Sequence, residues 1–183
     1  MRCPLCSITL VHHTLLDSHL PAYRCARCEG IWISADEYLR WVKTQGPALP
    51  AKQEDIAAIP TWDSPQAKLC PACGHLLLRY RVLPNVDFHV DRCGNCNGVW
   101  FDRGEWDVIV AHNLYDKVNQ FFTQPWQNRL REEETRAALD ALYLAKLGRA
   151  DYDRAKETRD WLMNSPQRAM LLAYLQANDP YKL

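Results

Sequence analysis

The chain contains no long apolar segment and no surplus of charge of either sign. No stretch approaches the roughly 18 consecutive apolar residues of a membrane-spanning helix, so we expect no membrane span. The 22 basic residues equal the 22 acidic residues, and no part of the chain is a basic block. Because binding to nucleic-acid phosphates usually needs clustered Lys and Arg, this balance weighs against a nucleic-acid-binding protein.

An export signal is also missing from the start of the sequence. No charged segment is followed there by an apolar run and a small-residue cleavage site. We therefore expect a cytoplasmic protein. In that reducing compartment, paired cysteines hold a metal ion more often than they form disulfides.

Cysteine is confined to the first 96 residues, where it forms four CxxC pairs. All eight cysteines precede residue 97. Units of about 40 residues are too small to fold on a hydrophobic core alone. Two CxxC turns together supply a tetrahedron of thiolates, the geometry of a structural zinc ion, although ligand type alone leaves iron open. The sequence therefore predicts two Zn²⁺ ions, one held by Cys3, Cys6, Cys25 and Cys28, the other by Cys70, Cys73, Cys93 and Cys96.

Other chemistry at these cysteines is a weaker hypothesis. Cys3-Pro-Leu-Cys6 and Cys70-Pro-Ala-Cys73 look like dithiol motifs, but thiol oxidoreductases carry one CxxC ahead of a helix in a βαβ setting, which is missing here. Closed four-cysteine sites leave no position for substrate or water. The sequence has no nucleophile elbow, phosphate loop or HExxH helix, and its histidines are not at ligand spacing. We expect no enzymatic activity and keep thiol redox or zinc transfer as a remote alternative.

The two sets of cysteines belong to an internal repeat. Residues 3–42 and 70–110 align at a constant offset of 68 from Arg24 and Arg92 onward. The aligned residues outside the cysteines include Gly30/Gly98, Trp32/Trp100 and Glu37/Glu105. We expect the two glycines to adopt positive φ and the two tryptophans to cover the metal sites. A short strand follows in each copy, over 31–33 or 99–101, and then a helix capped by Ser34 or Asp102.

This pattern resembles a known family. CPxC, a second CxxC, GxW and a capped helix start with Glu are similar to the transcription-factor-IIB-type zinc-finger family. The second copy fits best, through the run from Arg92 to Glu105; the first departs at Ser7, where Gly is common, and at Ser34, where Asp is common. The resemblance implies zinc binding and a zinc-ribbon fold, and it implies function only weakly.

The remaining sequence predicts a linker and a helical tail. Four prolines in 44–69 indicate a mostly extended linker that lets the two copies move, unless Ile56, Ile59 and Trp62 pack back on a ribbon. An apolar stripe from Trp106 to Phe121 predicts a long helix. Further helices are expected over 125–147, with Leu139, Leu142, Tyr143 and Leu147 buried, over 151–163, and after Ser165-Pro166.

We therefore predict a small metal-stabilised α+β fold. Its parts are a first zinc ribbon with a short helix, a Pro-rich linker, a second ribbon running into a long helix, and an all-α tail, over 1–43, 44–69, 70–110 and 111–183. The favoured function is a non-enzymatic adaptor in which ribbons and tail bind a protein partner, and the tail docks or forms a homo-oligomer. The alternative is transcription-related nucleic-acid binding through a local face of arginines: Arg24, Arg27, Arg79, Arg81, Arg92 and Arg103.

Overall fold

The structure is a computed structural model that describes residues 1–15, 20–44, 59–84 and 86–181. It divides into two compact units, Met1–Arg131 and Glu132–Leu183. We call them the ribbon unit and the tail unit and describe each by itself. None of the helices in the described residues is both long enough and apolar enough to cross a membrane.

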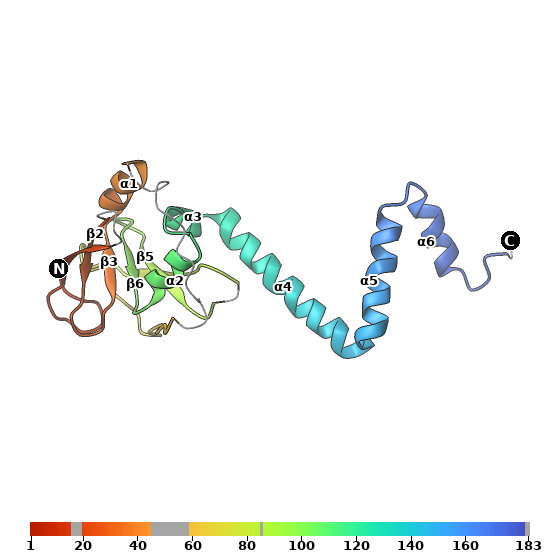
Figure 1. The fold of residues 1–183 in the computed structure, drawn as a ribbon, viewed down its shortest axis with the longest axis horizontal. Coiled ribbons are helices and arrows are strands. Elements are labelled where there is room, and N and C mark those ends of the chain that lie inside the picture. The colour runs from red at the N-terminus through yellow and green to blue at the C-terminus, as the bar shows by residue number, and fades with distance from the viewer. Residues whose placement is uncertain (16–19, 45–58, 85, 182–183) are drawn as a thin grey trace. The chain divides into compact units, whose positions relative to one another are not determined.

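The ribbon unit is built on one six-stranded antiparallel sheet in the order β1-β2-β3-β6-β5-β4 (Figure 1). Its strands are β1 (Val11–Leu15), β2 (Leu20–Arg24), β3 (Ile31–Ile33), β4 (Leu77–Arg81), β5 (His89–Cys93) and β6 (Val99–Phe101). Each copy of the repeat contributes three strands. The copies meet where β3 pairs with β6, with Trp32 directly opposite Trp100.

The expectation that the two copies move relative to each other is therefore wrong. The third strand of each copy, Ile-Trp-Ile or Val-Trp-Phe, is buried at every position. A strand with an open edge and apolar residues on both faces cannot remain in water at low cost. Each copy supplies the missing neighbour of the other, so the repeat forms a single sheet.

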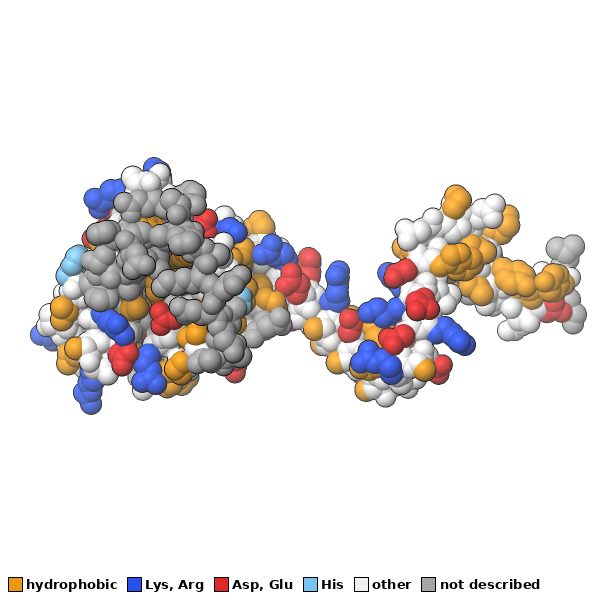
Figure 2. Space-filling model, in the orientation of Figure 1, with side chains coloured by type: hydrophobic (Ala, Val, Ile, Leu, Met, Phe, Trp, Pro, Cys, Tyr) orange, Lys and Arg blue, Asp and Glu red, His pale blue; other side chains and the backbone are white. Residues whose placement is uncertain are grey.

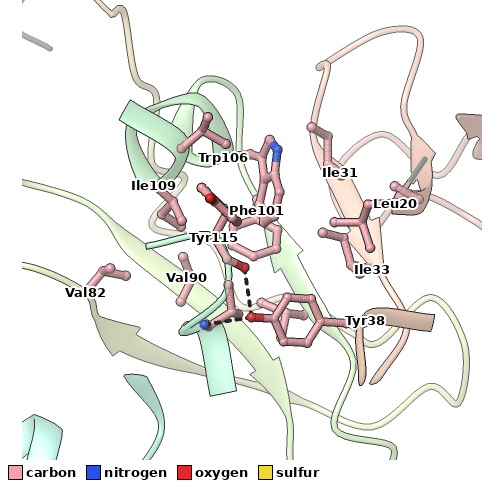
Figure 3. Close-up of a cluster of buried hydrophobic side chains, with 14 of the residues drawn as sticks. Leu20, Ile31, Ile33, Tyr38, Val82, Val90, Phe101, Trp106, Ile109 and Tyr115 are labelled. Carbon is pink, nitrogen blue, oxygen red and sulfur yellow. Dashed lines mark hydrogen bonds between the residues drawn. The ribbon is translucent and has the colours of Figure 1, made fainter. Parts of the chain in front are cut away.

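Three helices complete the core of the ribbon unit: α1 (Ala35–Thr44), α2 (Glu105–Ala111) and α3 (Val118–Phe121). Figure 3 shows how the first of them is fastened to the segment that follows the second repeat. The hydroxyl of Tyr38 donates to the carbonyl oxygen of Tyr115 at 2.8 Å and accepts from the Val118 N–H at 3.0 Å. Side chains from both copies thus share one apolar cluster.

The predicted long helix after the second ribbon is interrupted. α2 ends at Ala111, Asn113 adopts φ 56°, and the chain becomes helical again at Val118. A left-handed residue ends an α-helix, and Asn tolerates that conformation better than most residues. The apolar stripe that suggested one helix is still buried, but across two helices and a turn.

The second half of the predicted linker is part of the fold. Residues 45–58, including Ile56, lie outside the described residues. Ile59 packs partly buried against the core, whereas Trp62 is about half exposed. A Cβ on Gly104 would lie 2.2 Å from the carbonyl oxygen of Pro60. The chain from residue 59 onward is therefore packed on the second repeat.

Helices α4 (Gln124–Leu147), α5 (Arg149–Met163) and α6 (Arg168–Gln176) make up the rest of the described chain. Gly148, at φ 76°, separates α4 from α5, as the sequence predicts. Within the tail unit, the Tyr143 and Tyr152 rings stack at 6.2 Å. The expected burial of the α4 face is wrong: its four large apolar residues are 44–49% exposed, namely Leu139, Leu142, Tyr143 and Leu147.

Candidate metal centres

The structure brings the eight cysteines together in the two sets expected from the spacing. In each set, the four sulfur atoms lie within 4.8 Å of one another. The Sγ–Sγ distances include 3.5 Å for Cys3–Cys28 and 3.4 Å for Cys73–Cys93. A tetrahedral zinc site with Zn–S bonds of about 2.3 Å places its sulfurs about 3.8 Å apart. Both clusters therefore fit a structural Zn²⁺ ion, and all eight cysteines are free to bind it.

Backbone N–H groups of the CxxC turns point at the sulfur atoms. The N–H groups of Leu5 and Cys6 lie 3.4 and 3.3 Å from Cys3 Sγ, and the N–H of Cys96 lies 3.5 Å from Cys93 Sγ. These donors offset part of the negative charge of thiolates. Burial still raises the pKa of the Cys3 thiol to about 11. Because zinc binds the thiolate, metal binding at this site releases the Cys3 proton.

Two tryptophans cover the sites, and each one crosses to the other copy. Trp32 and Trp100 are fully buried in a cluster with the cysteines. A Cβ on Gly98 would lie 2.2 Å from the Trp32 ring, and a Cβ on Gly30 would lie 2.2 Å from the Trp100 ring. Each indole therefore rests on the glycine of the opposite ribbon, and neither position can accept a side chain without displacing it.

This contact corrects the role expected for the two glycines. The positive φ angles of these turns fall one residue earlier, at Glu29 (62°) and Asn97 (60°). Glycine is required at Gly30 and Gly98 because a tryptophan ring of the other copy packs against each of them. The backbone angle φ is not the reason. The left-handed positions after the first CxxC of each copy are Ser7 (58°) and Gly74 (76°).

The second repeat contains a buried ionic cluster that sequence reasoning missed. Lys68 Nζ lies 2.5 Å from Asp91 Oδ2 and 2.9 Å from Asp102 Oδ2, and these side chains are at most 2% exposed. Asp102 also accepts from the Trp100 Nε1–H at 2.7 Å and the Ser64 N–H at 2.8 Å. Through Asp102, the cluster holds the end of the linker, at Ser64 and Lys68, and the Trp100 ring next to the start of α2. No periodicity in the sequence singles out Lys68 or Asp91.

Glu105 closes this cluster on the side of α2. Its Oε2 accepts from the Asp102 N–H at 2.8 Å, which is one half of the predicted capping box. The other half is wrong: α2 begins after Gly104 and has no side-chain cap, so the Asp102 carboxyl does not cap the helix. Burial, together with the nearby charge of Asp102, raises the pKa of the Glu105 carboxyl well above its usual value. Asp63, Asp102 and Glu105 offer oxygens within 4.8 Å of one another. Since the Lys68 ammonium already neutralises Asp102, we assign these carboxyls a structural role.

The arginines beside the metal ligands bind neighbouring side chains. Arg24 pairs with Glu29 at 2.9 Å, and Arg92 at the equivalent position donates to Asn97 Oδ1 at 2.7 Å. Arg79 pairs with Asp63. Arg92 also lies over the Phe122 ring, 4.9 Å from its centroid. Among the six arginines proposed as a basic face, these three are thus held in local contacts.

Comparison with known proteins identifies the two repeats. The family model of the transcription factor zinc-finger matches residues 2–44 and 69–112, so both repeats are zinc ribbons of this family. The matched segments contain all eight cysteines, both tryptophans and the starts of the helices that follow them. No curated protein and no solved structure matches the chain.

Proposed function

We propose that this protein, with its two tandem ribbons of the transcription factor zinc-finger family, is a non-enzymatic adaptor whose second ribbon binds another protein. The observation that carries the proposal is a group of three exposed leucines on the second ribbon. Leu69, Leu76 and Leu78 are 57%, 54% and 48% exposed. We call them the leucine patch.

The leucine patch is contiguous. Leu69 and Leu76 face each other in an antiparallel bridge, so their side chains lie on the same side of the sheet. Leu78 follows Leu76 by two residues along the strand and therefore points to the same face. Between them, Leu77 points inward and is buried. Large aliphatic side chains grouped on one exposed face are typical of protein-binding surfaces.

The first ribbon differs at the same place. The bridge that corresponds to Leu69–Leu76 is formed there by Arg2 and Thr9. Both copies keep the buried residue between, Leu10 in the first and Leu77 in the second. The fold therefore does not need leucine at the exposed positions. At the third position the copies agree, because Val11, the counterpart of Leu78, is also exposed. The contrast at Leu69 and Leu76 supports a binding role for the second ribbon.

The proposed absence of catalysis rests on the form of the metal sites. Each set already provides four sulfur ligands, which complete the coordination of zinc and leave no position for a substrate. The role of the metal is then structural, because its binding supplies the folding free energy of a small module. Nucleic-acid binding remains the alternative function, and one experiment tests both.

The test is site-specific photo-crosslinking in the native host. A photoreactive amino acid replaces Leu76 in one variant and Thr9, its counterpart in the first ribbon, in the matched control. We expect a discrete protein adduct from position 76 and none from position 9. Replacement of Leu69 and Leu78 by Ser should remove the adduct, while the zinc content stays at two ions per chain.

Three results would contradict the proposal. Adducts of equal yield from both positions would show that the leucine patch has no special role. A variant whose adduct survives loss of Leu69 and Leu78 would show the same. A nucleic-acid adduct, with an affinity for DNA or RNA that falls steeply with salt, would favour the alternative function.

A further inference from the structure

The ribbon unit buries charged side chains, whereas charged side chains elsewhere lie in water, as those along α5 do in Figure 2. Lys68, Asp91, Asp102 and Glu105 are at most 1% exposed. The Lys68 ammonium joins the two aspartates. Glu105 has no ion pair among the described residues, so its burial needs another explanation.

Two carboxyl oxygens near the start of α2 are buried and have no hydrogen-bond partner in the described part of the chain. They are Glu105 Oε1 and Asp63 Oδ1. Both residues belong to the group of carboxyls whose oxygens lie within 4.8 Å of one another. Buried polar atoms in folded proteins almost always have a partner, so the two oxygens indicate that something joins them.

A single proton satisfies both oxygens. A carboxylate can only accept hydrogen bonds, whereas a protonated carboxyl also donates one. The oxygens of Asp102 are already occupied, Oδ1 by the Trp100 Nε1–H and Oδ2 by the Ser64 N–H and the Lys68 ammonium. The free acceptor for a proton on Glu105 is therefore Asp63 Oδ1. A divalent cation fits less well, because it needs about six oxygen ligands.

The surroundings decide which of the two carboxyls is the donor. Asp63 pairs with Arg79 and accepts from the His89 N–H at 3.1 Å, and these contacts stabilise its ionised form. Glu105 has no such support. Its burial, together with the charge of Asp102, raises the pKa of its carboxyl well above the usual value. Glu105 is thus the protonated partner.

The other charged and titratable groups around this pair come from four parts of the chain. They are Lys68 in the linker, Arg79 on β4, His89 and Asp91 on β5, and Asp102 before α2. With Glu105 ionised, four carboxylates would share the two permanent cations of this group. A proton on Glu105 brings the group closer to neutrality.

We propose that Glu105 is protonated at neutral pH and donates to Asp63, forming a pH-sensitive latch between the end of the linker and α2. When the pH rises, the Oε1–H bond breaks and the proton passes to water. Two carboxylates then lie side by side in a buried site. The same part of the linker is held by the Trp62 N–H, which donates to the Arg103 carbonyl oxygen at 3.0 Å. Repulsion between the carboxylates should release it.

The latch makes stability depend on pH in one direction. A carboxyl with a raised pKa holds its proton in the folded chain and loses it on unfolding. Its contribution to the free energy of unfolding is complete below the ordinary pKa of glutamate and is lost as the pH rises through the raised pKa of Glu105. At neutral pH, unfolding should therefore release about one more proton from the wild-type chain than from Glu105→Gln.

The direct test is carbon NMR of the zinc-loaded full chain with labelled glutamate carboxyls. The Glu105 signal is identified by its loss in Glu105→Gln. We expect this signal at the position of a protonated carboxyl at neutral pH, and at that of a carboxylate once the pH is raised. Asp63→Asn removes the charge of the acceptor, so the same change should occur at a lower pH.

The second test is chemical denaturation across the same pH range, with the zinc content measured at each pH. Glu105→Gln mimics the protonated acid, because its oxygen can still accept from the Asp102 N–H and its nitrogen can donate to Asp63. Its stability advantage over the wild type should grow as the pH rises. Glu37→Gln changes the partly exposed counterpart in the first copy and should follow the wild-type profile.

Two outcomes would overturn the inference. A carboxylate signal for Glu105 at neutral pH would mean that water, not a proton, joins the two oxygens. A protonated signal that titrates unchanged in Asp63→Asn would show that Asp63 is not the acceptor. Neither result bears on the crosslinks at position 76, so the adaptor function and this inference fail separately.

Discussion

The two ribbons share a fold, a ligand set and a sheet, yet they are stabilised differently. In the first, Arg24 and Glu29 form an exposed ion pair, and Trp32 Nε1 has no hydrogen-bond partner although it is buried. In the second, the equivalent Trp100 donates to Asp102, which belongs to the buried cluster with Lys68. The first copy has Ser34 where the second has Asp102. Duplication kept the metal site and the tryptophan, while the support around them diverged.

The largest expected loss of stability comes from the zinc sites, which both copies have. Cys93→Ser removes a zinc ligand of the second ribbon, and the lost binding energy is about 10 kcal/mol or more. Because β3 and β6 are paired, we expect the first ribbon to melt with the second. Cys25→Ser should have the same effect from the other side. Zinc stoichiometry and circular dichroism measure it; a variant that retains one bound zinc and one folded ribbon would show that the copies are independent.

The next largest loss of stability comes from a feature of the second copy, its buried ionic cluster. Lys68→Met leaves Asp91 and Asp102 buried without their cation, which typically costs about 3–5 kcal/mol. Arg24→Met breaks the exposed pair of the first copy and should cost less than about 1 kcal/mol. Chemical denaturation of both variants gives the comparison. Equal losses would mean that the buried cluster adds no special stability.

A third loss of stability, from crowding of the tryptophan rings, should be equal in the two copies. Gly30→Ala and Gly98→Ala each push a methyl group into a tryptophan ring, and overpacking of this kind costs about 1–3 kcal/mol. Gly94→Ala is the control, because its nearest neighbour is a Leu78 methyl at 4.0 Å. In thermal melts, Gly30→Ala and Gly98→Ala should have similar melting temperatures, both below that of Gly94→Ala. A large difference between the first two would mean that the tryptophan–glycine contacts are not equivalent in the two copies.

The smallest effect should raise stability. Glu29 has a left-handed backbone that the second copy gives to Asn97. Asn tolerates this conformation better than Glu, so Glu29→Asn should stabilise the chain by a few tenths to about 1 kcal/mol. Asn97→Glu is the reverse exchange and should destabilise by a similar amount. Two changes of the same sign in the melting temperature would refute this interpretation.

Local patterns in the sequence predicted what depends on local contacts. The ligand sets follow from the CxxC spacing, Ser34 caps the first helix, and α4 spans nearly the predicted range. The comparison with known proteins confirms the zinc-ribbon family.

Contacts between distant segments were out of reach of the same reasoning. Gly30 was recognised as special, but its reason lies in Trp100, on the other copy. Lys68 reads as a surface residue until the sheet brings Asp91 and Asp102 around it. The α4 stripe predicted a buried face, but its side chains are exposed within this chain. The leucine patch had a usable signal, the contrast between Leu69 or Leu76 and their counterparts Arg2 and Thr9.

The pairing of β3 with β6 determines how a fragment with a single repeat would behave. A fragment cut to a single copy would keep four cysteines and could still capture its ion. It would also expose its tryptophan ring and the free edge of its third strand. A second such fragment is the surface best matched to bury both, so a single-copy fragment should self-associate.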